Sequence, residues 1–126
     1  MTGRALRFRW GLALIGGVLA EIGVFAVMPI ALRFGPAGPL YIIPPAAFAL
    51  TFVAGALVAY RAGAWYVLHG ALVGLVAAII YIAMTIGVPL PAAYIVAHFL
   101  KVLGGVAGGY AVAIRRAKGG LTSHLL

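Results

Sequence analysis

Residues 16–23 read GGVLAEIG and place Glu21 in the middle of an apolar run. Glu21 is the only acidic residue among 126, whereas nine Lys and Arg residues give the chain a net charge of +8. Because a lone charge in an apolar medium is costly, Glu21 needs a partner. The best candidate is Lys101, near the middle of another apolar run, with His98 one helical turn away from it. Glu21, Lys101 and His98 are therefore the predicted site, either an intramembrane ion pair or a relay for protons or ions.

Four apolar runs account for nearly the whole chain, at residues of about 10–32, 40–60, 64–86 and 92–114. Each has the roughly 20 residues that a helix needs to cross the hydrocarbon core of a bilayer. The chain has 66% hydrophobic and 8% charged residues. Soluble globular proteins have about a quarter charged residues, so this composition excludes a soluble globular protein. The sequence predicts one all-α domain, residues 1–126, an integral membrane bundle of four antiparallel transmembrane helices with short loops.

The basic residues predict which ends of the helices face the cytoplasm. They gather before the first run, between the second and third, and after the fourth, as Arg4, Arg7, Arg9, Arg61, Arg115, Arg116 and Lys118. The other two connections hold only Arg33. The positive-inside rule then places both termini in the cytoplasm of a multi-pass protein of the bacterial inner membrane, with its basic ends against anionic lipid headgroups. Residues 115–126 are expected to be a cytoplasmic tail with little fixed structure.

The first apolar run has a second interpretation. Basic residues followed by an apolar segment that ends in Val18, Leu19 and Ala20 also fit a signal peptide cleaved before Glu21. The run continues unbroken to Leu32, which favours a retained helix.

Small residues recur along the predicted helices and indicate where other helices pack. Small side chains let two helices approach closely, within one chain or between copies. We expect this role for Gly16, Ala20, Gly23, Gly70, Gly74, Gly104, Gly105, Gly108 and Gly109. In the fourth helix, residues 98, 101, 105 and 108 share one face, which should be buried against protein. A homo-oligomer or a partner in a membrane complex is compatible with these faces.

Two local expectations concern the middle of the chain. The second helix should begin near Tyr41, which places Pro44 and Pro45 in its first turn, where backbone amides lack intrahelical partners. His69 falls just inside the third apolar run and is interpreted as an interfacial residue, the alternative being a proton carrier.

Two functions follow from the predicted site. In the first, Glu21 and Lys101 lock two helices together, His98 is hydrogen-bonded to a nearby carbonyl, and the protein is a subunit or assembly partner of a membrane complex. In the second, Glu21 exchanges protons or binds a cation in a small proton-coupled transporter. No enzyme, cofactor, metal or nucleic-acid partner is expected, because one acid cannot form a carboxylate pair and the three His residues are scattered in depth. A quinone or haem site at His98 is a further alternative.

Residues 16–24, GGVLAEIGV, resemble the first-helix signature of small multidrug resistance transporters, which are short four-helix proton antiporters. The resemblance implies that Glu21 is a shared carboxylate for proton and substrate and that the protein works as a dimer. The aromatic third-helix signature of that family is missing here, and Lys101 and His98 have no place in its pattern. The general layout is similar to small four-helix bacterial membrane proteins of unknown function, which is the assignment we prefer.

Overall fold

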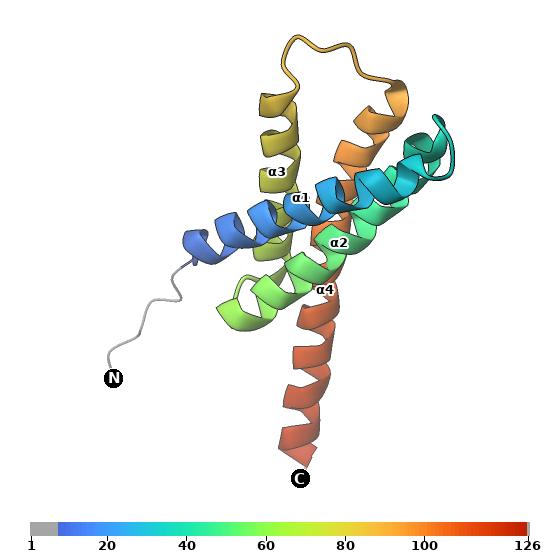
Figure 1. Ribbon diagram of the computed structural model, residues 1–126. Helices are drawn as coiled ribbons and strands as arrows, with labels where there is room; N and C mark the ends of the chain where they lie inside the picture. The colour runs from blue at the N-terminus through green and yellow to red at the C-terminus, as the bar shows by residue number, and fades with distance from the viewer. Residues whose placement is uncertain (1–7, 126) are drawn as a thin grey trace.

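The computed structural model describes residues 8–125, with side chains described as far as Gly119 (Figure 1). These residues form the helices α1 (Trp10–Leu32), α2 (Gly38–Ala62), α3 (Tyr66–Met84) and α4 (Ala92–Leu125), and no strand occurs among them. Each helix holds a stretch long and apolar enough to cross a membrane. The prediction of an all-α protein with four membrane-spanning helices is confirmed. The antiparallel order and the sidedness stay predictions, and Arg4 and Arg7 lie outside the described residues.

The helices pack so that α1 and α4 lie on opposite sides of α2 and α3. In Figure 1, α1 crosses in front of the other helices, and α4 lies behind it. Among the described residues, α1 and α4 are the one pair of helices whose Cα atoms nowhere come within 8 Å of each other. Any contact between α1 and α4 must therefore be made by long side chains.

Helix α4 continues well beyond the predicted end of its span. It runs to Leu125, so the expectation of a tail with little fixed structure is wrong. After Ile114 the sequence holds Arg115, Arg116, Ala117 and Lys118, all good helix formers, and no proline interrupts them. Figure 1 shows this part of α4 extending past the other three helices.

Helix α2 begins earlier than expected, at Gly38 rather than near Tyr41. Pro39 lies in its first turn, where the missing amide has no intrahelical acceptor to lose. Pro44 and Pro45 lie inside the helix instead, where each removes a hydrogen bond to the carbonyl four residues earlier.

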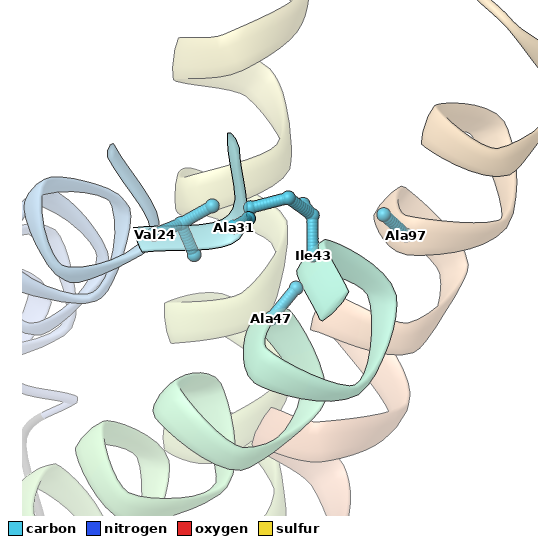
Figure 2. Close-up of a cluster of buried hydrophobic side chains, with 5 residues drawn as sticks. All are labelled: Val24, Ala31, Ile43, Ala47 and Ala97. Carbon is cyan, nitrogen blue, oxygen red and sulfur yellow. The ribbon is translucent and has the colours of Figure 1, made fainter. Parts of the chain in front are cut away.

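Two clusters of buried apolar side chains hold the bundle together. The first joins α1, α2 and α4 through the five side chains shown in Figure 2, Val24, Ala31, Ile43, Ala47 and Ala97. The second joins α1, α2 and α3 through Ala13, Val58 and Val73. Along α1, Glu21 stands between the residues of the two clusters. A polar residue therefore lies between two apolar layers that keep it from water.

Glycines set the closest approaches between helices. A Cβ atom added to Gly105 would collide with the carbonyl oxygen of Gly70, and one added to Gly74 would collide with that of Lys101, so no larger residue fits where α3 meets α4. The other predicted packing glycines also have a neighbouring helix within 4 Å of such an atom, namely Gly16, Gly23, Gly104, Gly108 and Gly109. Ala20 is buried. The eight glycines therefore lie at contacts between helices, and Ala20 lies in the interior of the bundle.

Candidate functional site: an ion pair inside the bundle

The site centres on an ion pair between the first and last helices. The Lys101 Nζ atom donates a hydrogen bond to Glu21 Oε2 at 2.8 Å, and each side chain is only 2% exposed. Because α1 and α4 do not approach each other directly, the two side chains bridge the layer formed by α2 and α3. The ion pair thus connects two helices whose Cα atoms nowhere come within 8 Å of each other in the described part of the chain.

Helical periodicity and small residues explain how the pair is accommodated. On α1, Gly17 precedes Glu21 by one turn and Val24 follows it by three residues, so all three share the buried face. On α4, Gly105 follows Lys101 by one turn on the face that packs against α3. Because Gly17 and Gly105 have no Cβ atom, α3 packs closely against α1 and α4 beside the two charged residues.

Tyr81 of α3 completes the surroundings of the ammonium group. The Lys101 Nζ atom lies 4.7 Å from the centroid of the Tyr81 ring, a cation–π contact. Phe25, Tyr94 and His98 surround the same ring, with centroids 5.9, 6.1 and 5.1 Å away. Tyr81 was not among the predicted site residues. The one feature of the sequence that could have indicated Tyr81 is its hydroxyl-bearing side chain deep inside the third apolar run.

Several polar atoms at the site have no hydrogen-bond partner. The Glu21 Oε1 atom and both ring nitrogens of His98 are buried without one. The expected hydrogen bond between His98 and a nearby carbonyl is therefore not formed. His98 lies beside Tyr81 rather than bonded to the ion pair. The structure thus brings Glu21 and Lys101 into direct contact and places His98 next to them through the aromatic ring.

His69 has a separate, local arrangement. The backbone amide of Arg9 donates to His69 Nε2 at 3.1 Å, and His69 Nδ1 lies 2.9 Å from the carbonyl oxygen of Trp65. This pattern requires a neutral ring that carries its proton on Nδ1. The ring also stacks on Phe8, with centroids 4.0 Å apart. His69 is thus buried, with both nitrogens occupied, and it ties the start of α1 to the start of α3; its depth in a membrane stays a prediction.

The described residues form several surface grooves, and neither Glu21 nor Lys101 lines any of the three considered next. One lies between α2 and α4 with a volume of about 740 Å³, one between α3 and α4 with about 570 Å³, and one between α1 and α2 with about 500 Å³. His98 lines the groove between α3 and α4, where most of the other lining residues are apolar. Within residues 8–125, no group of three or more His, Cys, Asp or Glu side chains gathers around a point that suits a metal ion.

Comparisons with known proteins do not assign the chain to a family. No family model, curated protein or solved structure matches it.

Proposed function

We propose that the chain is a non-enzymatic integral membrane protein, a subunit or assembly partner of a membrane complex, in which the Glu21–Lys101 pair locks the helices together. The observation that carries this proposal is the burial of the pair, because each of the two side chains is only 2% exposed. A carboxylate that exchanges protons or takes up a cationic substrate needs a route from water. Here the ammonium group of Lys101 already occupies the position beside Glu21 that such a cation would take.

The geometry suits a role in assembly. Removing one partner of a buried ion pair leaves an uncompensated charge, which costs about 3–5 kcal/mol, whereas replacing both with apolar residues is often neutral or stabilising. The pair therefore adds little net stability and instead penalises arrangements in which α1 and α4 are wrongly placed. Since α1 and α4 share no backbone contact, the ion pair makes their relative position depend on correct packing of α2 and α3.

The proposal includes a bacterial inner-membrane location with both termini in the cytoplasm. Its support is the gathering of Arg61, Arg115, Arg116 and Lys118 at one set of helix ends, against Arg33 at the other. Many large apolar side chains are exposed on the outer faces of the helices, as expected for surfaces that contact lipid or a partner helix.

A flux measurement tests the locking role. Purified protein is reconstituted into liposomes with an imposed pH gradient, and a trapped pH-sensitive dye reports proton movement. We expect the parent chain and the Glu21→Met/Lys101→Met variant to behave like empty liposomes, and both proteins to be monodisperse and helical. Proton flux that depends on Glu21 would contradict the proposal. In cells, the assembled double variant should support the same phenotype as the parent.

The second candidate function is a small proton-coupled transporter that uses Glu21 as the proton-exchanging carboxylate. The observation in its favour is the set of unpartnered buried atoms, Glu21 Oε1 and the two nitrogens of His98. Such atoms are costly, and a conformation in which they accept or donate protons would satisfy them. In the same liposome assay this function requires flux that Glu21→Gln abolishes and His98→Leu reduces.

A further inference from the structure

The largest of the three grooves lies where α2 and α4 diverge. The two helices are in close contact at Gly108, where an added Cβ atom would collide with the carbonyl oxygen of Phe52. Beyond this contact α2 ends at Ala62, whereas α4 continues to Leu125, as Figure 1 shows. The resulting groove of about 740 Å³ is lined by Ala56, Leu57, Tyr60, Ala111, Val112, Arg115, Arg116 and Gly119.

The groove combines an apolar wall with a cationic rim. Small and aliphatic side chains from both helices form the wall, and Arg115 and Arg116 lie at the end nearest the α4 C-terminus. The Arg116 guanidinium lies 4.5 Å from the centroid of the Tyr60 ring and donates to the Tyr60 carbonyl oxygen at 3.5 Å. Arg116 is therefore held at the rim of the groove by α2.

The guanidinium groups of Arg115 and Arg116 are not neutralised by any acidic side chain of the chain. Glu21 is the only acidic residue, and it is bonded to Lys101 inside the bundle. The acidic side chains of the chain therefore supply no counter-anion for Arg115 and Arg116. Both residues directly follow the apolar run that ends near residue 114, which puts them at the level of lipid phosphate groups if α4 spans the bilayer.

We propose that this groove binds one anionic phospholipid. Its phosphate group lies against the guanidinium groups of Arg115 and Arg116, which match phosphate oxygens in geometry and charge. One acyl chain lies along the apolar wall between α2 and α4. The groove volume falls in the range of about 300–1,000 Å³ typical of ligand sites. This inference is independent of the role of Glu21 and Lys101, because neither residue lines the groove.

Native mass spectrometry of the purified full chain tests the site. The protein is placed in nanodiscs of phosphatidylcholine with a small fraction of phosphatidylglycerol, and the retained lipid is counted. Because a basic residue near the surface contributes about fivefold to the attraction for anionic lipid, Arg115→Gln/Arg116→Gln should lower phosphatidylglycerol retention about 25-fold. Arg33→Gln, which removes a charge from the opposite end, should leave retention unchanged.

A second variant separates the groove from a general effect of charge. Ala111→Phe keeps both arginines but fills the apolar wall, and we expect it to lower phosphatidylglycerol retention at least fivefold. It also tests the site if the double arginine variant does not fold. The proposal is overturned if Ala111→Phe retains the lipid normally, if Arg33→Gln loses as much lipid as the double variant, or if millimolar inorganic phosphate displaces the lipid, since the last result indicates a simple anion site.

Discussion

Replacing Lys101 with methionine should destabilise the protein more than replacing Glu21 with methionine. Both substitutions break the same 2.8 Å ion pair and keep a side chain of similar length. They differ in the charge that is left behind. Lys101→Met leaves the Glu21 carboxylate with no hydrogen-bond donor, because its other oxygen has none in the parent chain. Glu21→Met leaves the Lys101 ammonium group 4.7 Å from the Tyr81 ring centroid.

The expected magnitudes follow from these surroundings. Orphaning a buried charge costs about 3–5 kcal/mol, which we expect for Lys101→Met. A desolvated cation–π contact is worth up to about 2 kcal/mol, and a flexible lysine stem can relocate its charged end, so Glu21→Met should cost about 1–3 kcal/mol. The double substitution removes both charges and should cost no more than about 1 kcal/mol.

Reversible unfolding in mixed micelles, followed by loss of helical circular dichroism, measures these differences. In a Tyr81→Leu background, the gap between the two single variants should shrink by about 1–2 kcal/mol, because the aromatic ring is gone. Equal costs for Glu21→Met and Lys101→Met would refute the role of the ring. A double variant as unstable as the sum of the two singles would refute the ion pair itself.

Three further predictions concern other parts of the structure. Gly105→Ala should cost about 1–3 kcal/mol in the same unfolding assay, because its Cβ atom collides with α3. His69→Leu should cost about 2 kcal/mol through two lost hydrogen bonds and a lost ring stack, whereas His98→Leu should be neutral or stabilising because it removes unpartnered nitrogens. A membrane-impermeant maleimide should label Ala37→Cys in intact cells, but Ala117→Cys only after permeabilisation, since the chain has no native cysteine.

The glycine prediction has a matched control, and each of the other two has an outcome that would contradict it. For Gly105→Ala the control is Gly11→Ala, where an added Cβ atom meets nothing within 4 Å and the helix gains up to about 1 kcal/mol. Equal destabilisation by the two glycine variants would argue against tight contact between α3 and α4. A large loss of stability in His98→Leu would show that its nitrogens have partners, and labelling of Ala117→Cys in intact cells would reverse the proposed orientation.

Some features of the site were accessible from residue types alone. Glu21 is the one acid of the chain and Lys101 is a basic residue near the middle of an apolar run, so charge neutralisation points from one to the other. Tyr81 and the bonds of His69 were not accessible in this way. An aromatic ring or an imidazole in an apolar run fits many surroundings, and only the packing of neighbouring helices decides what each one contacts.

The helix ends, too, were predicted from the sequence in some cases and not in others. Hydrophobic length predicted the beginning and end of α1 correctly, because the apolar run there coincides with the helix. It did not predict that α4 would continue to Leu125 or that α2 would begin at Gly38. A helix ends where backbone hydrogen bonding stops, whereas an apolar run ends where side-chain polarity changes, and the two need not coincide.

The sequence by itself determined that the protein has four apolar helices and one buried acid in need of a partner, because length, hydrophobicity and charge are properties of single segments. The tertiary structure alone decided that α1 and α4 stand apart and that Glu21 reaches Lys101 across the layer of α2 and α3. Small residues on several helix faces allow many ways of packing. Which one is adopted depends on how all the faces fit together at once.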